Sequence, residues 1–514
     1  MNAGSRSPAP NANLYALFRS RFPADLDDCW LETADGQYYS WRDLERGSAK
    51  IANLLTSLKL PTGSRIAVQV EKSAEALMLY LATVRAGFVY LPLNTAYRAD
   101  EMTYFIGNAS PAVVVCSPLN FGWIAQIAFS SGVAHVYTLD APTQGRNSGS
   151  LLSRAVHFAD SFETVQSYAD DLAAILYTSG TTGRSKGAML THGNLASNIR
   201  VLHEAWRWQP GDVLLHALPL FHIHGLFVAA HGALYNGSKM IFLPKFDSDA
   251  VIRQLPRSTV VMGVPTYYVR LLSAPDFTRT ACANIRLFVS GSAPLLADTF
   301  TQFAERTGHT ILERYGMSET AMLTSNPYDG QRRAGTVGPA LPGVSVRVVN
   351  SAGQPCATGE IGDIEVKGPN VFQGYWQMPE KTAEEFTADG YFKTGDVGRL
   401  DADGYLSIVG RSKDLIISGG YNVYPKEIEC VIDDLPGVLE SAVIGVPHPD
   451  FGEAVTAIVV PHHGATVSEP EIIGALKARI ANFKVPKRVH VVDELPRNAM
   501  GKVQKNVLRE QFGG

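Results

Sequence analysis

The chain has 514 residues, of which 46% are hydrophobic and 18% are charged, and its formal net charge is −4. This composition is typical of a folded globular protein and excludes a largely disordered one. The length exceeds what one hydrophobic core of ordinary size fills, so we expect about two to four domains. The slightly negative charge gives no bulk attraction to nucleic acid or to an anionic membrane, so we expect neither as a partner.

The cysteines and the chain ends bear on the cellular compartment. Five cysteines are scattered without a CxxC pair or a nearby histidine at metal-ligand spacing, which argues against disulfides and structural zinc. The start, MNAGSRSPAPNANLYALF, lacks the apolar segment of a signal peptide, and no uninterrupted apolar run approaches the ~18 residues of a membrane span. The end, QFGG, is not a peroxisomal signal. We therefore expect a cytoplasmic protein with no obligate protein partner.

Short β-branched runs alternate with helical patterns over most of the chain. The pattern SAEALMLYLATVRAG predicts a helix over 73–87, with Ser73 as its N-cap. Buried strands separated by helices predict parallel sheets in an α/β architecture, and the runs are at 65–70, 111–116, 239–244, 258–265 and 286–291. From residue 340 the segments become β-rich with tight turns, and 401–404 is a hairpin signal.

A smaller unit follows the sequence GRSKD. Pro425 opens a predicted helix, where proline is well placed because an N–H in the first turn would have no partner within the helix. The strand SAVIGVP, a helix over 469–481 and the strand VHVVD come next. We expect a large N-terminal domain of layered α/β subdomains with a β-rich subdomain over 1–409. A hinge over 410–413 joins it to a small α+β domain over 414–514.

The stretch YTSGTTGRSKG, 177–187, follows an apolar strand and is rich in hydroxyls and glycines. Glycines let backbone N–H groups approach phosphate oxygens closely, and a lysine adds a mobile positive charge. A P-loop NTPase would need a glycine before its lysine and Ser or Thr after it, whereas Ser185 and Gly187 flank Lys186. The register therefore argues against a P-loop, and a flexible surface loop is the other open interpretation.

This stretch resembles the phosphate-binding loop of the adenylate-forming superfamily, which comprises acyl-CoA synthetases, peptide-synthetase adenylation domains and luciferases. ERYGMSET, 313–320, resembles the segment that in this superfamily stacks its tyrosine on adenine and supplies a glutamate for Mg²⁺. The resemblance implies that Thr178 and Glu319 hold Mg²⁺, with Glu319 also catalytic. The nucleotide-binding residues that it implies in these two segments are Thr178, Ser179, Gly180, Thr181, Thr182, Gly183, Lys186, Glu313, Arg314, Tyr315, Gly316 and Ser318.

Four further segments match the superfamily in the expected order. VSGSAPL implies that Gly291, Ser292 and Ala293 form the wall against adenine, and TGDVGRLDADGYLSIVGRSKD implies that Asp396 and Arg411 hold the ribose. Lys413 falls at the hinge between domains. ISGGYNVYPKEIE implies that Gly419, Gly420 and Tyr421 line the path of CoA. PRNAMGKVQKNVLRE places Lys502 as the catalytic lysine that bridges the substrate carboxylate and the α-phosphate, with Lys505 as the neighbour that could be confused with it.

The resemblance implies a reaction of a carboxylic acid with ATP, Mg²⁺ and then CoA. The acyl pocket is expected to be lined by 217–227, 262–272, 285–291 and 315–317, so that His222, Ser290 and Met317 contact the acid, with His222 also catalytic. In the strand RLFVSG the period of two puts Arg286, Phe288 and Ser290 on one face. Arg286 is then either at the pocket floor or paired with a structural carboxylate; Arg270 is the second candidate for the floor.

An unpaired buried guanidinium would favour a second carboxylate on the acid and reject monocarboxylates. Independently, segments such as EKSAEALMLYLATVRAG, RLFVSGSAPLLAD and ERYGMSET resemble malonyl-CoA synthetases, which implies malonate as the acid and tolerance of methylmalonate. Ile223 departs from the threonine expected there, which would narrow the pocket or shift its preference. The open alternatives are a synthetase for another short mono- or dicarboxylic acid, transfer to carrier-protein pantetheine, a P-loop-like ATPase and a non-catalytic relative.

Overall fold

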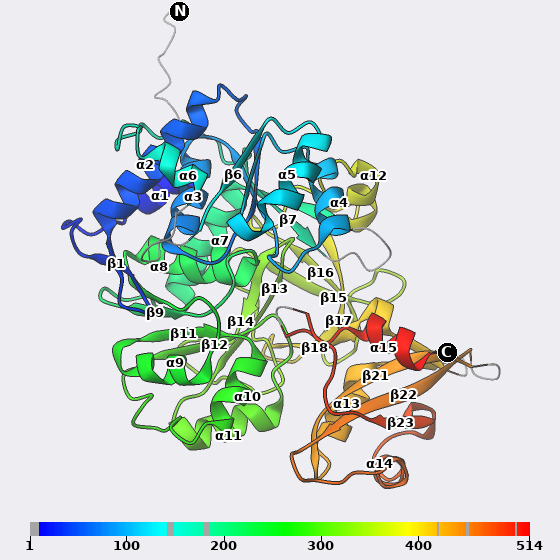
Figure 1. Ribbon diagram of the computed structural model, residues 1–514. Helices are drawn as coiled ribbons and strands as arrows, with labels where there is room; N and C mark the ends of the chain where they lie inside the picture. Colours follow the sequence, from blue (N-terminus) through cyan, green and yellow to red (C-terminus); the bar gives the residue numbers. More distant parts are fainter. Residues whose placement is uncertain are drawn as a thin grey trace, which may run out of the picture.

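The computed structural model describes residues 10–140, 149–178, 185–418, 421–448, 452–498 and 501–513. Two large sheets with helices, a smaller antiparallel sheet and a C-terminal unit form the molecule, and the C-terminal unit lies beside the end of the larger part that carries α10, α11 and β18 (Figure 1). The predicted combination of α/β layers, a β-rich subdomain and a small α+β unit is confirmed. In the described part of the chain, no helix is long and apolar enough to cross a membrane.

The first sheet has six strands in the order β6-β5-β3-β4-β7-β8 and is parallel except for the β7–β8 pair. Its strands are β3 (Arg65–Gln69), β4 (Val89–Pro92), β5 (Val113–Cys116), β6 (His135–Thr138), β7 (Leu172–Thr178) and β8 (Lys186–Thr191). The helices in this part of the chain are α2 (Trp41–Ser57), α3 (Ala74–Arg85), α4 (Ala99–Ala109), α5 (Phe121–Ser130) and α6 (Ser150–Ala155). The Ser73 hydroxyl accepts from the N–H of Ala76, so the predicted N-cap of α3 is confirmed.

The second sheet has eight strands in the order β14-β13-β12-β11-β9-β10-β1-β2, parallel except at its two edge pairs. Its strands are β1 (Cys29–Thr33), β2 (Tyr38–Ser40), β9 (Val213–His216), β10 (Lys239–Phe242), β11 (Val260–Gly263), β12 (Leu287–Ser290), β13 (Leu312–Met317) and β14 (Ala321–Ser325). The helices are α1 (Leu14–Arg19), α7 (His192–Ala205), the π-helix η2 (His224–Ala230), α8 (His231–Asn236), α9 (Ser248–Gln254), α10 (Pro265–Ser273) and α11 (Ala297–Thr307). Because the carboxyl ends of parallel strands meet at one edge, the segments after β9, β11, β12 and β13 converge there.

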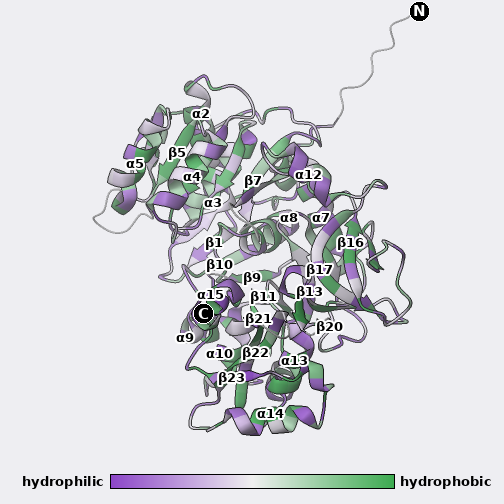
Figure 2. Ribbon diagram, turned by 90° about the vertical axis from the view of Figure 1, so that its right-hand side faces the viewer, coloured by the Kyte–Doolittle hydropathy of each residue, from purple (hydrophilic) through white to green (hydrophobic). Residues whose placement is uncertain are grey.

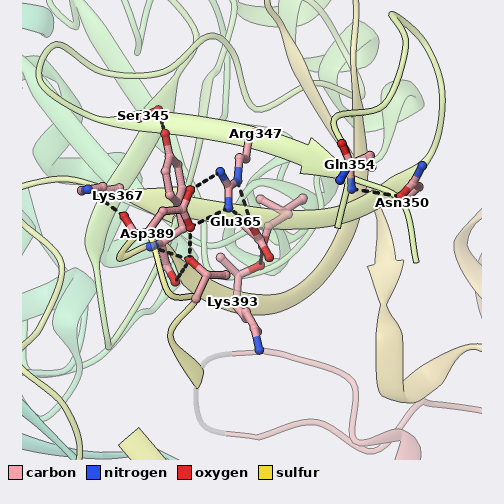
Figure 3. Close-up of polar contacts among 12 residues, drawn as sticks. Ser345, Arg347, Asn350, Gln354, Glu365, Lys367, Asp389 and Lys393 are labelled. Atoms are coloured by element: carbon pink, nitrogen blue, oxygen red, sulfur yellow. Dashed lines mark hydrogen bonds and ion pairs between the residues drawn. The ribbon is translucent and has the colours of Figure 1, made fainter. Parts of the chain in front are cut away.

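The third sheet is the predicted β-rich part, an antiparallel meander of β15 (Ser345–Val349), β16 (Gly362–Lys367), β17 (Phe392–Leu400) and β18 (Leu406–Arg411), with α12 (Pro379–Glu385) between β16 and β17. The predicted turn at 401–404 joins β17 to β18, and Gly404 has φ 80° there. Arg347 fixes one edge of the sheet: its guanidinium contacts Glu365 and Asp389 at 2.7 and 2.6 Å (Figure 3). This ion-pair cluster links β15 to β16 and to the segment before β17.

The C-terminal unit has its own sheet and core. Its strands are β19 (Ile416–Ser418), β20 (Tyr421–Val423), β21 (Val438–His448), β22 (Gly452–Pro461) and β23 (Arg488–Val491), and its helices are α13 (Pro425–Asp433), α14 (Glu469–Lys477) and α15 (Lys505–Phe512). Figure 2 shows hydrophobic residues along strands such as β22 and a mixture of hydrophilic and hydrophobic residues on the outer helix α14. Pro425 opens α13 as predicted. Arg411 ends β18 in the third sheet, and Ile416 begins β19 in the C-terminal sheet. The predicted hinge at 410–413 overlaps this interval and stays a prediction.

Candidate active site

Three residues predicted to bind phosphate and metal, Thr178, Lys186 and Glu319, lie together beside Tyr375. Thr178 Oγ1 lies 3.4 Å from Glu319 Oε1, and the Tyr375 hydroxyl donates to the same oxygen at 3.1 Å. Lys186 Nζ lies 4.1 Å from the centre of the Tyr375 ring and 3.3 Å from Glu385. Burial raises the pKa of Glu319, because a carboxylate in this position has lost most of its water.

This arrangement fits Mg²⁺. The ion takes hard oxygen ligands and is usually held by one or two protein groups together with substrate phosphates. Glu319 and Thr178 would supply the two protein oxygens, and the described residues contain no cluster of three or more His, Cys, Asp or Glu side chains that would hold an ion alone. The remaining predicted loop residues, Ser179, Gly180, Thr181, Thr182 and Gly183, lie outside the described residues.

The residues predicted to hold the ribose also meet. Asp396 and Arg411 are partners in the register of β17 and β18, and Arg411 Nε lies 2.9 Å from Asp396 Oδ1. The Tyr315 hydroxyl donates to Asp396 Oδ2 at 2.5 Å. The Asp396 carboxylate raises the pKa of Arg411, and burial raises the pKa of Tyr315. A buried carboxylate between a tyrosine and an arginine offers its remaining lone pairs as acceptors for a diol.

The predicted adenine wall follows β12. Gly291 is buried, and Ser292 and Ala293 are half-buried. Ser292 has φ 72°, an uncommon backbone conformation for a residue other than glycine, and its hydroxyl lies 3.3 Å from Nδ1 of His224. Gly316 packs so closely that a Cβ there would lie 2.0 Å from the carbonyl oxygen of Ala321. Neither Gly316 in β13 nor Gly291 after β12, where a Cβ would lie 2.4 Å from the guanidinium of Arg314, leaves room for a side chain, and the contact of 291–293 with adenine stays a prediction.

Arg314 carries the most unusual charge in the site. Arg314 is 3% exposed, its Nε and Nη2 have no hydrogen-bond partner, and burial lowers its pKa to about 9. The guanidinium lies directly against Gly291, where a Cβ would come within 2.4 Å of it. Glu313 is the adjacent strand residue, and its Oε1 accepts from the N–H of Leu295 at 3.0 Å. Successive strand residues point to opposite faces, so the Glu313 side chain points away from that of Arg314. No carboxylate among the described residues forms an ion pair with Arg314.

Two histidines lie next to this guanidinium. His222 Nδ1 accepts from the N–H of His224 at 3.2 Å. Burial, together with the charges of Arg314 and Lys502, lowers the pKa of His222 to about 3, so the ring is neutral. Ser290 is buried with an unpartnered hydroxyl, as is Nε2 of His224. Unsatisfied buried polar atoms are uncommon and mark a place where a ligand can complete the hydrogen bonding.

Arg286 does not reach this region, and we correct its predicted place at the pocket floor. It precedes β12, whereas Ser290 ends the strand, so the two residues lie at opposite ends. Its Nε and Nη2 contact Asp212 at 2.8 and 2.5 Å, and Nη1 donates to the carbonyl of Trp206. The alternative that Arg286 pairs with a structural carboxylate fits this geometry. Arg270, the other candidate, is exposed on α10.

Lys502 reaches the site from the C-terminal unit. Gly501 packs against the large part of the chain, where a Cβ would lie 2.9 Å from Oγ1 of Thr266. Burial lowers the pKa of Lys502 to about 8, with a further contribution from Arg411, and Lys502 in turn acts on His222. Lys505 instead contacts Glu429 of its own unit at 2.5 Å. Of these two lysines, Lys502 is therefore the one that lies near Arg411 and His222, and its action on a bound substrate stays a prediction.

The remaining predicted residues concern the hinge and CoA. Lys413 lies in the short 3₁₀ turn Ser412–Asp414 between the two sheets, and burial lowers its pKa. Tyr421 begins β20, whereas Gly419 and Gly420 lie outside the described residues. Met317 ends β13 and Ser318 follows it in the turn, and both residues are half-buried. The hinge and CoA assignments stay predictions.

The sequence did not identify Tyr375, which bridges Lys186 and Glu319. It placed Thr266 only within the acyl-pocket segment 262–272, whereas the structure puts Thr266 against Gly501 of the lysine loop. Tyr375 lies between β16 and α12, far from both partners along the chain. An exposed tyrosine and a core tyrosine look alike in a single sequence, so no local signal could have identified it.

Comparison with protein-family models matches residues 21–376 to the AMP-binding enzyme model and residues 427–502 to the model of the AMP-binding enzyme C-terminal domain. The first match alone spans more than half of the chain. The chain belongs to the AMP-binding enzyme family. The Thr178–Lys186–Glu319 cluster lies within the first match, and the Asp396–Arg411 pair lies between the two matches.

Similar AMP-binding enzymes include a malonate–CoA ligase of Arabidopsis thaliana, 36% identical over 98% of this chain and 90% of its own length. A feruloyl-CoA synthase of an Amycolatopsis species is 35% identical over 93% of this chain and 95% of its own length. Among solved structures, ATP-bound MatB of Rhodopseudomonas palustris is similar with a TM-score of 0.94 and 57% identity, covering 98% of this chain and 99% of that chain.

Proposed function

We propose that this chain is an ATP-dependent malonyl-CoA synthetase, an AMP-forming acid–thiol ligase. It would convert malonate, ATP and CoA into malonyl-CoA, AMP and pyrophosphate through malonyl-adenylate. The malonate–CoA ligase and MatB similarities support this proposal, as does the AMP-binding family. The feruloyl-CoA synthase and the malonate–CoA ligase are nearly equally identical to this chain, so sequence identity to these two relatives does not choose the acid. The choice rests on the structure of the site.

The observation that carries malonate is the buried guanidinium of Arg314. A charge in this environment is costly unless a partner neutralises it. An acid with a second carboxylate supplies that partner, whereas a monocarboxylate leaves the guanidinium and its free N–H groups unpaired. A site built around a charged group rejects an acid that lacks the matching group more strongly than shape alone would. The neutral His222 beside Arg314 adds no competing charge.

The first half-reaction follows from the positions of the charges. The substrate carboxylate attacks the α-phosphorus of ATP, and pyrophosphate leaves. Lys502 would lie between carboxylate and α-phosphate, and Lys186 at the outer phosphates, so both would offset negative charge as it builds in the transition state. Glu319 and Thr178 would hold Mg²⁺, which supplies charge neutralisation on the phosphates.

In the second half-reaction the thiol of CoA attacks the acyl carbon of the adenylate and AMP leaves. We propose that the C-terminal unit turns about Lys413, which withdraws Lys502 and brings Gly419, Gly420 and Tyr421 to the path of the thiol. Such a movement gates the two steps and does not accelerate the chemistry itself. The change of sheet between Arg411 and Ile416 supports a hinge at this place.

The test is a product assay with ATP, Mg²⁺, CoA and a panel of mono- and dicarboxylates, analysed by mass spectrometry. We expect malonyl-CoA and AMP, a smaller yield from methylmalonate because of Ile223, and little product from butyrate or benzoate. If malonate yields no acyl-CoA while a monocarboxylate does, the proposed acid is wrong. ADP in place of AMP would contradict the reaction class.

We also propose a cytoplasmic location. The five cysteines are free thiols, which fits a reducing compartment. Fractionation of the native host with a specific antibody tests this location.

A further inference from the structure

Two basic side chains outside the nucleotide site, Lys72 and His216, form a chain of hydrogen bonds that ends on the backbone carrying His224. Lys72 follows β3, and its Nζ lies 2.8 Å from Nδ1 of His216. His216 ends β9 and is 1% exposed. Its Nε2 lies 2.8 Å from the carbonyl oxygen of Gly225 in the first turn of η2.

These contacts determine the protonation of His216. A carbonyl oxygen can only accept, so Nε2 must carry the proton that it donates to Gly225. Nδ1 then presents a lone pair and accepts from Lys72. A cationic imidazole would instead turn an N–H toward the lysine. Burial and the charge of Lys72 lower the pKa of His216 well below its usual value, consistent with a neutral ring.

Lys72 has no role as an ordinary ion-pair partner. No carboxylate among the described residues forms a salt bridge with it, and Nζ also donates to the carbonyl of His216 at 2.8 Å. Nζ lies 4.2 Å from the centre of the Phe242 ring, and burial lowers the pKa of Lys72 well below its usual value. Its polar contacts therefore converge on His216.

The anchored turn belongs to the wall of the acyl region. A Cβ at Gly225 would lie 2.0 Å from the carbonyl oxygen of Pro219, so the turn packs directly on the segment that leads to His222. In the same turn the N–H of His224 donates to His222, and Nδ1 of His224 contacts Ser292. Single π-helical turns are uncommon and are often at functional sites. A displacement of Gly225 would thus move both histidines.

We propose that Lys72 and His216 are positioning residues for the acyl group. Lys72 holds His216 in the tautomer that anchors Gly225, and the anchored turn sets His222 and His224 beside the acid. This inference rests on the proposed function for the identity of the acid, and it concerns two residues to which no role at the nucleotide, the metal or the acid has been assigned above. Lys72 lines a cavity of about 230 Å³ together with Pro219 and Leu220, which belong to the segment 217–227 expected to line the acyl pocket.

The test compares variants in steady-state kinetics with malonate and ATP. Lys72→Met removes the donor while keeping most of the side-chain length, and we expect the KM for malonate to rise about tenfold with the KM for ATP within about twofold, as for one lost positioning hydrogen bond. Lys245→Met is the matched control, because Lys245 is an exposed lysine on the same cavity. It should leave both constants unchanged.

His216 is tested by two substitutions of different chemistry. His216→Gln keeps one donor for Gly225 and one acceptor for Lys72, so it should stay within about threefold of the wild type. His216→Phe removes both the donor and the acceptor, so its KM for malonate should rise about as much as in Lys72→Met. The double variant should show little further rise, because both substitutions break the same chain of hydrogen bonds. Thermal unfolding checks that each variant folds. If His216→Phe does not fold, the KM values for malonate of Lys72→Met and His216→Gln test the inference.

Several outcomes would overturn the inference: an unchanged KM for malonate in Lys72→Met, equal rises in both KM values, or fully additive losses in the double variant. A wild-type protein that makes no malonyl-CoA would instead contradict the proposed function. The two failures are therefore distinguishable.

Discussion

The guanidinium of Arg286 is bound at two points by the carboxylate of Asp212, with Nε–Oδ1 and Nη2–Oδ2 distances of 2.8 and 2.5 Å. The Asp212 side chain is 3% exposed, and Arg286 is 15% exposed. Removing one member of a buried pair leaves the other charge without compensation.

Arg286→Met should therefore lower the stability of the large domain by about 3–5 kcal/mol. It should leave the ratio of kcat/KM for malonate to that for butyrate unchanged, because the pair is remote from Ser290. Thermal unfolding measures the change in stability, and steady-state kinetics with malonate and with butyrate measure the ratio. Arg270→Met, at an exposed position on α10, is the control. A selective fall of kcat/KM for malonate in Arg286→Met would mean that Arg286 does contact the acid.

Arg314→Met should have the opposite profile. It removes a guanidinium that has no carboxylate partner in the described part of the chain, so the loss of stability should be small or reversed. The kcat/KM for malonate should fall at least about 100-fold, since a buried charge pair with the substrate is lost. The kcat/KM for butyrate should fall much less. Equal losses for both acids would mean that Arg314 does not select the acid.

Lys502→Ala should separate the two half-reactions. Pyrophosphate release with malonate and ATP should fall at least about 100-fold, because a charge aimed at the transition state is removed. Thioester formation from supplied malonyl-adenylate and CoA should continue near the wild-type rate. Lys505→Ala serves as the neighbouring control, since Lys505 pairs with Glu429. Loss of both half-reactions in Lys502→Ala would contradict the proposed domain movement.

The pH dependence of adenylation should report Lys502. Its pKa is lowered to about 8 by burial, so the lysine is charged below that pH and loses its proton above it. The kcat/KM for ATP, which reports the free enzyme, should decline as pH rises through about 8, and kcat should decline at higher pH because bound phosphate favours the charged form. Lys502→Arg, which stays charged, should remove this decline even if its rate is lower. A decline that persists in Lys502→Arg belongs to another group.

Glu319→Gln should weaken the use of Mg²⁺. We expect the Mg²⁺ concentration for half-maximal adenylation to rise about tenfold or more, because a charged oxygen ligand is replaced by a neutral one. Calorimetry of ATP binding without Mg²⁺ should show little change. Tyr375→Phe, which removes only the hydroxyl that contacts Glu319, should have a smaller effect of the same kind. Unchanged Mg²⁺ dependence in Glu319→Gln would place the metal elsewhere.

Much of the fold could be predicted because its signals are local. The N-cap at Ser73, the proline that opens α13 and the turn at 401–404 each depend on a few neighbouring residues. The strands were predicted within a few residues because a buried parallel strand is an apolar run between helices. The order of the nucleotide segments was predicted from resemblance, and Thr178, Lys186 and Glu319 do meet.

The sequence by itself determined the mixed α/β fold class, the family and the chemical types of side chain at the site, whereas the domain bounds stay a prediction. Only the tertiary structure decided which arginine is free. The period of two predicted Arg286 and Ser290 on one face, but it could not say that Arg286 precedes β12 whereas Ser290 ends it. Whether a guanidinium is paired depends on residues distant along the chain: Asp212 neutralises Arg286, and no carboxylate among the described residues does so for Arg314. Charge compensation acts through space, so it becomes visible only when the strands are assembled.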